Sequence, residues 1–521
     1  MKATASYDSI VVGGGHNGLV CAAYLARAGR RVLVLEAADR LGGAAVTREF
    51  APGFSVSACA HLLHLMPAAL MRDLGLEKSG LRFAATGLPT VALALDARHL
   101  SFAPGNLAGL AQASSTDAAA LADWQRQLQR FARALHPLLT RTPPRLGTDA
   151  WRDRLTLLGL GWRLRRLGRR DLRELLRIGG MCVHDLLEDR FRLPLLKGAL
   201  ALDAVLGTNY GPRSPGTVLS LLYRFAASQG TDALALPQGG LGALSEALAR
   251  VARAAGAEIR TAAVVERIRV RDDHAAGVLL TSGEEIAGRT VVSSADPKST
   301  FLGLVGSEHL DAGFVRRVSH VRSRGLTAKL HLALERLPEF PGLDERALRA
   351  RLLVAPSSDY IERAYNHTKY NEFSAAPMLE ITIPTLTDAS LAPPGKHVMS
   401  VIVQYAPYTL AGGWPAARQA FTERVIDTLA GYAPHLREAI CATELLTPPD
   451  IEREFRISGG HWHHAELALD QFLMVRPVPG AAQYQTPVPG LFLCGAGSHP
   501  GGGVMGLAGR NAARQLMREA A

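Results

Sequence analysis

The sequence has few cysteines and no long apolar run. Its five cysteines are scattered, and none forms a C-x-x-C pair. This pattern argues against a disulfide scaffold, a zinc site and a redox-active dithiol. The start, MKATASYDSI, lacks the apolar core of a signal peptide, and no uncharged apolar run of about 18 residues follows. We therefore expect a cytoplasmic protein, either soluble or held peripherally at the inner face of a membrane.

The net charge is positive, but much of the excess is local. The 521 residues carry a formal charge of +11, and 48% are hydrophobic and 20% charged, as in a well-packed globular enzyme. Nine arginines and three acidic residues stand between Arg152 and Arg177, a local excess of six charges. No recognised nucleic-acid motif accompanies them, so we expect no nucleic-acid partner.

Residues 151–178 form a basic helical segment in which arginines alternate with leucines and with Trp162 at roughly helical spacing. One interpretation is a solvated helix that packs on its own domain and is weakened by its glycines. A second is an interfacial helix that meets a protein partner or a membrane surface of anionic lipid. The sequence leaves both interpretations open.

The clearest motif lies near the N-terminus, in YDSIVVGGGHNGLVCAAYLARAGRRVLVLEAADRLGG. It predicts a strand at 9–12, a glycine turn at 13–18, a helix to about residue 28 and a second strand at 32–35, which ends at Glu36. This order of strand, turn, helix, strand and acid is typical of a Rossmann unit that binds a dinucleotide.

Each part of the motif has a physical role. Gly13 permits the tight turn, Gly15 allows the backbone to approach a pyrophosphate, and Gly18 allows the helix to pack closely on the strand. The helix N-terminus supplies N–H groups and positive potential. Glu36 can accept hydrogen bonds from the ribose hydroxyls.

The residues that follow favour FAD over NAD. Arg40 and the pair Gly42-Gly43 resemble the extension found in FAD enzymes of the glutathione-reductase and amine-oxidase type. A second nicotinamide fingerprint is not evident, since the glycines within 237–250 lack a preceding strand and a following acid. We therefore expect electrons to leave to oxygen or a quinone.

A second glycine-rich stretch, LCGAGSHPGGGVMGLAGR, spans residues 493–510. We expect its backbone to approach the same FAD and a last helix to begin at Gly503 and run to Met517, with its N-terminus near the flavin. The alternative is that these glycines serve packing alone.

The order of predicted elements indicates an α/β protein with a discontinuous Rossmann-type FAD-binding domain of the glutathione-reductase and amine-oxidase type. We assign this domain to residues 1–75, 236–300 and 451–521. Residues 76–235, which contain the basic helical segment, and 301–450 would build an α+β substrate-binding domain.

Several motifs together resemble the phytoene-desaturase family of FAD enzymes. They are IVVGGGHNGLVCAAYLARAG, VLVLEAADRLGGAA, VVSSADP, LDQFLMVRPVPG and GLFLCGAGSHPGGGVMGLAGRNAA. The sequence is most similar to the phytoene dehydrogenase-like branch of that family. Family members include carotenoid desaturases, carotenoid isomerases and retinol saturases, so the resemblance implies FAD chemistry on apolar, polyene-like substrates.

The motifs and the resemblance together give a set of predicted cofactor contacts, in which Val265 matches the valine that meets the adenine in such flavin domains. The predicted contacts are Gly13, Gly14, Gly15, Asn17, Gly18, Glu36, Ala37, Arg40, Gly42, Gly43, Ala44, Val265, Gly495, Ala496, Gly497, Gly503, Val504 and Met505.

Candidates for acid–base work are few. His61 follows Gly42-Gly43 at the distance where this family approaches the flavin face, and Glu380 is a carboxylate of the predicted substrate domain. We predict that both are catalytic residues. The alternative is that His61 is an ordinary packed histidine without a catalytic role. His461 and His463 would share a face of a strand, but a third ligand is not evident, so we expect no metal.

We therefore expect an FAD-dependent oxidoreductase that transfers hydride between a C–C bond of a hydrophobic, isoprenoid-like substrate and flavin. One alternative is an amine or amino-acid oxidase, which typically carries an aromatic pair at the flavin; residues 494–510 contain no aromatic residue. The other is a flavoprotein that mainly binds a lipid or a partner, and the basic helical segment would then be the part that binds.

Overall fold

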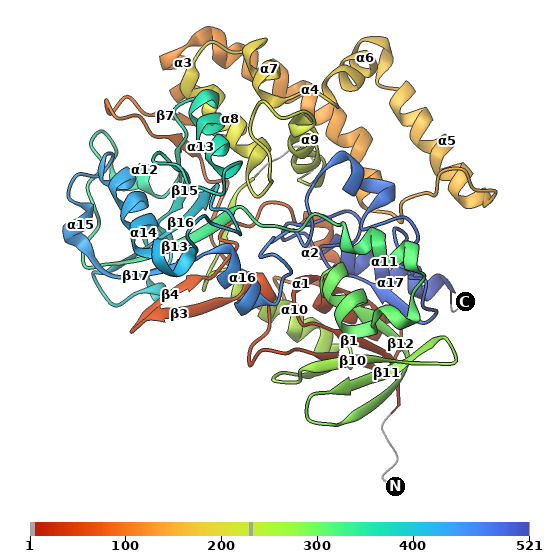
Figure 1. Ribbon diagram of the computed structural model, residues 1–521. Helices are drawn as coiled ribbons and strands as arrows, with labels where there is room; N and C mark the ends of the chain where they lie inside the picture. Colours follow the sequence, from red (N-terminus) through yellow and green to blue (C-terminus); the bar gives the residue numbers. More distant parts are fainter. Residues whose placement is uncertain (1–5, 229–232, 520–521) are drawn as a thin grey trace.

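Two seven-stranded sheets organise the chain in the computed structural model, which describes residues 6–228 and 233–519 (Figure 1). In the first sheet, β1 (Tyr7–Val12) lies parallel to β2 (Val32–Leu35) on one side and to β12 (Glu285–Ser293) on the other. β9 (Glu258–Arg260) extends the sheet beyond β2, and β18 (Leu491–Leu493) pairs with β12. The residues of β2 and β18 are all buried, as expected for parallel strands covered on both faces.

An antiparallel meander continues this sheet. β10 (Val265–Arg271) pairs with β11 (His274–Leu280), which pairs with β12. Asp272 and Asp273 form the turn between β10 and β11, and both have positive φ. The sheet therefore combines strands from the start, the middle and the end of the chain.

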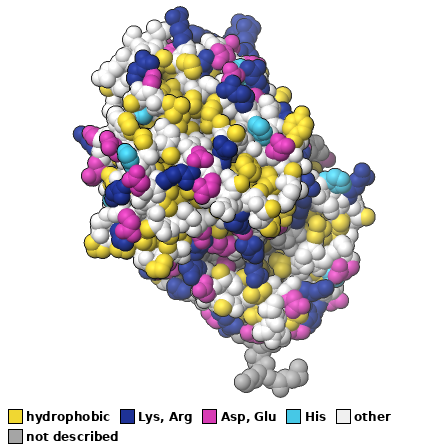
Figure 2. All heavy atoms as spheres, turned by 60° about the vertical axis from the view of Figure 1, so that its left-hand side comes forward, with side chains coloured by type: hydrophobic (Ala, Val, Ile, Leu, Met, Phe, Trp, Pro, Cys, Tyr) yellow, Lys and Arg dark blue, Asp and Glu magenta, His cyan; other side chains and the backbone are white. Residues whose placement is uncertain are grey.

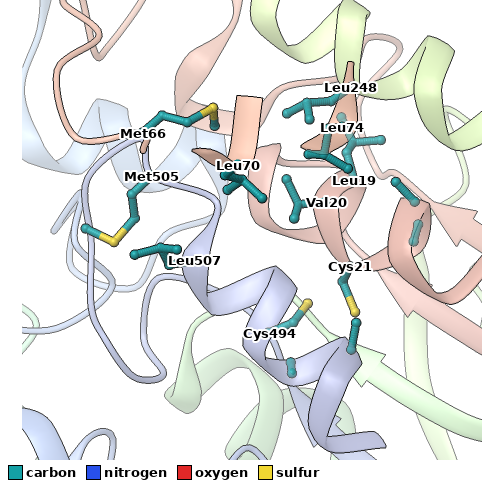
Figure 3. Close-up of a cluster of buried hydrophobic side chains, with 14 of the residues drawn as sticks. Leu19, Val20, Cys21, Met66, Leu70, Leu74, Leu248, Cys494, Met505 and Leu507 are labelled. Atoms are coloured by element: carbon teal, nitrogen blue, oxygen red, sulfur yellow. The ribbon is translucent and has the colours of Figure 1, made fainter. Parts of the chain in front are cut away.

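Three helices pack together on one face of the first sheet (Figure 3). They are α1 (His16–Arg27), α10 (Gly242–Ala254) and α17 (Leu507–Glu519). A Cβ atom on Gly509 would lie 2.0 Å from the carbonyl oxygen of Asn17, so glycine is what allows α17 to approach α1. A Cβ atom on Gly18 would lie 2.1 Å from the carbonyl oxygen of Gly13.

Two buried thiols meet within this core, where Cys21 of α1 lies beside Cys494 (Figure 3). The hydrogen bond with Cys494 and burial raise the pKa of the Cys21 thiol well above its usual range. A buried thiol that stays protonated packs as a small apolar side chain and is a poor nucleophile.

The prediction that the last helix begins at Gly503 was wrong. α17 begins at Leu507, one turn later. The positive φ angles of Gly503 (98°) and Gly506 (69°) keep residues 503–506 in a loop, because both lie outside the right-handed helical region.

The second sheet is built mainly from the middle of the chain, in the order β17-β13-β16-β15-β14-β6-β7. Every residue of its strand β13 is buried. Its strands are β13 (Thr327–Leu334), β14 (Arg351–Val354), β15 (Met378–Thr382), β16 (His397–Gln404), β17 (Ile440–Leu446), β6 (Thr90–Ala92) and β7 (Leu100–Phe102).

Short elements connect and cover the two sheets. Two further pairs of strands are β3 (Thr47–Ala51) with β4 (Phe54–Ser57) and β5 (Phe83–Thr86) with β8 (Ala235–Pro237). The remaining helices outside the helical layer are α2 (Ala68–Leu74), α11 (Ala312–Ser319), α12 (Glu345–Leu348), α13 (Ser358–Thr368), α14 (Trp414–Ala430), α15 (Leu436–Ala439) and α16 (Pro448–Phe455).

A helical layer lies at the top of Figure 1. The basic helical segment is part of it and is divided into α5 (Trp151–Arg165) and α6 (Gly168–Ile178), which extend away from the two sheets at the upper right. No residue of α5 is buried. None of the helices in the described ranges is both long and apolar enough to cross a membrane. The other helices of this layer are α3 (Ala108–Ala113), α4 (Ser115–Leu139), α7 (Val183–Glu188), α8 (Pro194–Val205) and α9 (Thr217–Ala227).

Candidate active site

A central cavity of about 610 Å³ is lined by residues from both sheets. One end lies against the turn between β1 and α1. The other reaches β15 and β16 of the second sheet, where Glu380 and Ile402 are in the wall. Residues far apart in the sequence therefore line one cavity.

Backbone dominates the first end of the central cavity. Gly15 forms an isolated bridge with Gly42, whose N–H donates to the carbonyl oxygen of Gly14 at 3.0 Å. The carboxylate of Glu36 accepts hydrogen bonds from the N–H of Gly14 at 2.6 Å and of Ala38 at 2.9 Å. Glu36 is thereby fixed in the wall, beside the first turn of α1.

The protein itself does not require glycine at position 15. Its φ of −67° suits any residue, and a Cβ atom there would meet nothing closer than the carbonyl oxygen of Gly42 at 4.0 Å. No side chain caps the N-terminus of α1. A bare backbone facing a cavity at a helix N-terminus is suited to a phosphate group.

Buried polar atoms without partners gather around the same cavity. Within the described residues, side-chain atoms with no hydrogen-bond partner include one from each of six residues of the wall. Such atoms are rare in folded proteins, and those that face a cavity are available to bind a polar group. They are His16 Nε2, Asn17 Oδ1, His64 Nδ1, Trp462 Nε1, His463 Nδ1 and His464 Nδ1.

Twelve of the predicted cofactor contacts lie in the wall of the central cavity. They come from the N-terminal motif, from β10 and from the C-terminal glycine-rich stretch. These twelve are Gly13, Gly15, Asn17, Glu36, Ala37, Gly42, Gly43, Ala44, Val265, Ala496, Gly503 and Val504.

The other six predicted contacts lie outside this wall. Gly14 binds Glu36 through its N–H, as described above, and Gly18 packs on Gly13. Arg40 is half exposed and pairs with its neighbour Asp39 at 3.1 Å. The remaining three belong to the C-terminal glycine-rich stretch and are buried: Gly495, Gly497 and Met505.

The two predicted catalytic residues are brought together at the other end of the cavity. His61 Nε2 lies 2.8 Å from an oxygen of Glu380, and both side chains are at least nine-tenths buried. Burial and the charge of Lys329 lower the pKa of His61 to about 4. Burial alone would raise the pKa of Glu380, but Arg351 and His61 outweigh it and hold that pKa well below its usual value.

Lys329 of β13, which sequence reasoning missed, completes this pair. Its Nζ lies 2.8 Å from His61 Nδ1, and burial lowers the pKa of Lys329 to about 7. These contacts assign the tautomer of a neutral His61: Nε2–H donates to Glu380, and Nδ1 accepts from Lys329. A lysine within an otherwise apolar strand, TAKLHLAL, is the signal by which the sequence marks it.

Arg351 joins two carboxylates of the cavity wall. Its Nε donates to Glu380 at 2.5 Å, and its Nη2 donates to Asp203 at 2.7 Å. Arg224 also pairs with Asp203, at 3.3 Å. Both carboxylates are therefore neutralised by arginine within the protein.

The histidines near the C-terminus do not form a metal site. In the described ranges there is no group of three or more side chains placed to hold a metal. His461 Nε2 donates to the Glu466 carboxylate at 3.3 Å, whereas His463 and His464 line the central cavity. His499, in the C-terminal glycine-rich stretch, donates to the carbonyl oxygen of Leu138 at 2.8 Å.

Arg476 is buried and holds the C-terminal loops together. Its Nη2 donates to the carbonyl oxygens of His463 at 2.7 Å and Ala496 at 3.0 Å. Arg476 therefore fixes two loops of the cavity wall through their backbone.

Comparison with known proteins identifies the architecture. Residues 18–517 match the model of a family described as flavin-containing amine oxidoreductase. The chain belongs to that family. Its cofactor is FAD, and it is an FAD-dependent oxidoreductase.

The relatives of this chain have names that describe different activities. A mouse protein named pyridine nucleotide-disulfide oxidoreductase domain-containing protein 2 is 38% identical, over 98% of this chain and 94% of its own. A protein of Castellaniella defragrans named as one of the subunits of limonene dehydrogenase is 27% identical, over 100% of this chain and 96% of its own. A neurosporene-forming phytoene desaturase of Cereibacter sphaeroides is 27% identical, over 52% of this chain and 51% of its own.

Solved structures show the same fold. A putrescine oxidase bound to putrescine superposes with a TM-score of 0.60 at 16% identity, covering 99% of this chain and 100% of its own. The discontinuous first sheet and the second sheet are thus the flavin amine oxidase fold.

The residues present fit FAD. The side-chain-free backbone of Gly15 at the start of α1 suits the pyrophosphate, and Glu36 lies where ribose hydroxyls would meet it. The C-terminal stretch contributes Ala496 and Gly503 to the same cavity. The unpartnered polar atoms of the wall supply groups for the remaining polar edge of such a cofactor.

Proposed function

We propose that this oxidoreductase is of the desaturase type: it removes a hydride from one carbon and a proton from the neighbouring carbon of a hydrophobic, polyene-like or isoprenoid-like substrate, which leaves a double bond between them. Two relatives support this assignment by name, because limonene and phytoene are both isoprenoid hydrocarbons. Family membership alone also fits an amine oxidase, so the proposal depends on the chemistry of the cavity.

The observation that carries the proposal is the neutralisation of the carboxylates at the substrate end. Glu380 is bound by His61 and Arg351, and Asp203 is bound by Arg351. A protonated amine entering here would meet carboxylates that already have cationic partners, and its buried charge would be poorly compensated. A neutral hydrocarbon has no such cost.

Apolar side chains provide the rest of the surface for such a substrate. They exclude water and hold a hydrocarbon by contact, which orients it without hydrogen bonds. FAD, when bound, accepts the hydride. The apolar residues of the wall include Leu62, Leu65, Leu206, Ile402, Leu467 and Trp462.

The proton that must leave the neighbouring carbon has a group to receive it. Glu380 is one of the carboxylates in the wall, and the contacts of 2.8 Å from it through His61 to Lys329 form a chain of three titratable groups. We propose that Glu380 receives the proton only in passing and that neutral Lys329 holds it, because Arg351 and His61 keep the pKa of Glu380 low. Lys329 has a pKa of about 7, so the charge of the chain depends on pH near neutrality.

Anaerobic bleaching of the flavin tests the substrate class. The FAD-loaded protein is mixed with limonene or phytoene in detergent, and separately with putrescine and a panel of primary amines. The proposal expects bleaching by the isoprenoids. Bleaching by amines alone contradicts it and favours an amine oxidase, and bleaching by neither favours a binding role.

The electron acceptor is tested in the same anaerobic absorbance experiment. We propose that oxygen or a quinone accepts the electrons. Photoreduced enzyme is mixed with either acceptor, and return of the flavin absorbance is followed. Recovery with NAD(P)⁺ but with neither oxygen nor a quinone would contradict the proposal.

A further inference from the structure

A second hollow, the arginine cleft, shares no lining residue with the central cavity. It has a volume of about 770 Å³ and lies between the start of α5, the end of α4 and α17. α5 and α17 both occupy the right-hand side of Figure 1. The arginine cleft is lined by Arg141, Arg152, Arg510, Arg514, Arg518, Trp151, Leu155, Thr140, Thr142, Thr156, His136 and Asn511.

Five arginines face this cleft and no carboxylate lines it. Within the described residues, none of the five forms an ion pair with an acidic side chain. Arg510 is nine-tenths buried; its Nη2 donates to the carbonyl oxygen of Thr140 at 3.0 Å, whereas its Nε has no hydrogen-bond partner. Burial lowers the pKa of Arg510 and the charge of Arg514 lowers it further, against smaller raising effects of two tyrosines and of Asp73, which is not part of the lining.

An arrangement of this kind favours an anion. Guanidinium groups bind phosphate through paired N–H donors, and a buried arginine with an unused N–H gains most from such a partner. Some surface arginines elsewhere are paired with acidic side chains, as Arg437 is with Glu423 and Asp427. On the face in Figure 2, basic and acidic side chains are interspersed.

An exposed apolar stripe on α5 begins at the rim of the arginine cleft. Trp151, Leu155, Leu158 and Trp162 are 56–69% exposed, and their spacing places them on one face of the helix. Six of the ten large hydrophobic side chains found exposed in the described residues lie between 146 and 176. The stripe is therefore a local feature and not the general character of the surface.

We propose that the arginine cleft binds the phosphate of an anionic phospholipid head group while the apolar stripe of α5 enters the membrane interface. Charge alone would fit any phosphate-bearing ligand. The adjoining stripe of tryptophan and leucine identifies the ligand as part of a lipid surface, because such side chains insert at the boundary of head groups and acyl chains. This inference goes beyond the proposed reaction and does not depend on it.

Vesicle binding of the FAD-loaded full chain tests the proposal. The protein is sedimented with vesicles of phosphatidylcholine alone or mixed with phosphatidylglycerol. We expect binding to the mixed vesicles at least about tenfold tighter than to neutral ones, and a loss of this preference at high salt. Equal binding to both vesicles, or no binding to either, would overturn the proposal.

Two sets of variants separate the parts of the site. R152Q/R514Q/R518Q changes exposed side chains only and should weaken binding to mixed vesicles about tenfold or more. R346Q/R424Q removes exposed arginines elsewhere and should change it less than twofold. L158S/W162S lies outside the cleft and should abolish vesicle binding while the weak binding of glycerol phosphate, measured by calorimetry, persists.

The variants also define the outcomes that contradict the proposal. If glycerol phosphate binds wild-type protein and R152Q/R514Q/R518Q weakens that binding, but vesicles do not bind, the cleft serves a free phosphate compound. If R346Q/R424Q weakens vesicle binding as much as R152Q/R514Q/R518Q, the effect is one of net charge and the cleft is not a site. FAD content and thermal unfolding verify that each variant is folded.

Discussion

The two ends of the central cavity are built in different ways. At the first end, the backbone of Gly13, Gly15 and Gly42 faces the cavity, and Glu36 is the main charged group. At the second end, side chains from separate strands meet in a buried network around Glu380. We propose that the first end binds the FAD and that the second determines which substrate is oxidised, so mutations at the two ends should affect different measurements.

The largest effect is expected from Gly18→Ala. The added Cβ atom would lie 2.1 Å from the carbonyl oxygen of Gly13, so α1 must move from β1. We expect a loss of about 4 kcal/mol or more in the free energy of unfolding, together with loss of FAD. Thermal and denaturant unfolding of the apoprotein and the FAD content measure the two effects.

Gly15→Ala is the matched control for this prediction. Its Cβ atom has open space in the protein, so the apoprotein should unfold within about 0.5 kcal/mol of wild type while its affinity for FAD falls. If the two alanines destabilise the apoprotein equally, the distinction between packing glycine and cofactor glycine is wrong.

The next largest effect is expected at the other end, from Arg351→Met. Removal of this buried cation leaves Glu380 without its arginine partner and weakens the compensation of Asp203. We expect a loss of about 3 kcal/mol in the free energy of unfolding, because a buried charge deprived of its partner is costly. The folded fraction should still bind FAD with nearly wild-type affinity, as measured by fluorescence titration. A large loss of FAD affinity in folded protein would show that the two ends are not separable.

Lys329→Met gives a smaller, pH-dependent effect. Burial lowers the pKa of Lys329 to about 7, so between pH 7 and its ordinary pKa the unfolded chain binds a proton that the folded chain does not. Wild-type stability should therefore rise relative to the variant as pH increases, by about 3 kcal/mol between roughly pH 6 and pH 9. Denaturant unfolding of both proteins across this range measures the difference.

The control is Lys78→Met, at an exposed lysine. Its free energy of unfolding should change with pH in the same way as that of wild type. If the free energy of unfolding of Lys329→Met also changes with pH as that of wild type does, the buried lysine keeps an ordinary pKa. The chain from Glu380 to Lys329 would then stay charged at neutral pH, contrary to the account of the second end.

The smallest effect is expected from Arg40→Ala. The sequence places Arg40 among the cofactor contacts, but its side chain is half exposed, lies outside the cavity wall and pairs with Asp39. We expect the dissociation constant for FAD to change less than about threefold, in keeping with the small energies of exposed ion pairs. A loss of affinity of tenfold or more would show that FAD binding draws Arg40 into the site.

The difference between the ends also explains what the sequence predicts well. The strand, glycine turn, helix and Glu36 of the first end lie within a few tens of residues, and glycine spacing reports backbone geometry directly. FAD and the α/β architecture could therefore be predicted. The helix start at residue 503 could not, because a run of glycines and apolar residues carries no signal for the positive φ angles that delay the helix to Leu507.

The second end depends on contacts between distant segments. His61 and Glu380 were predicted separately, but their pairing spans 319 residues. Arg351 and Asp203 gave no signal because charged residues are common in any sequence. Lys329 stood in an apolar strand, a detectable anomaly whose partner only the fold reveals.

The most direct test of this account is a crystal structure of the FAD-loaded protein with an isoprenoid ligand such as limonene. The account predicts one FAD that contacts both Gly13–Gly15 and the C-terminal pair Ala496 and Gly503, with the ligand between it and Glu380. An FAD that contacts only the N-terminal motif, or a ligand bound away from Glu380, would contradict it.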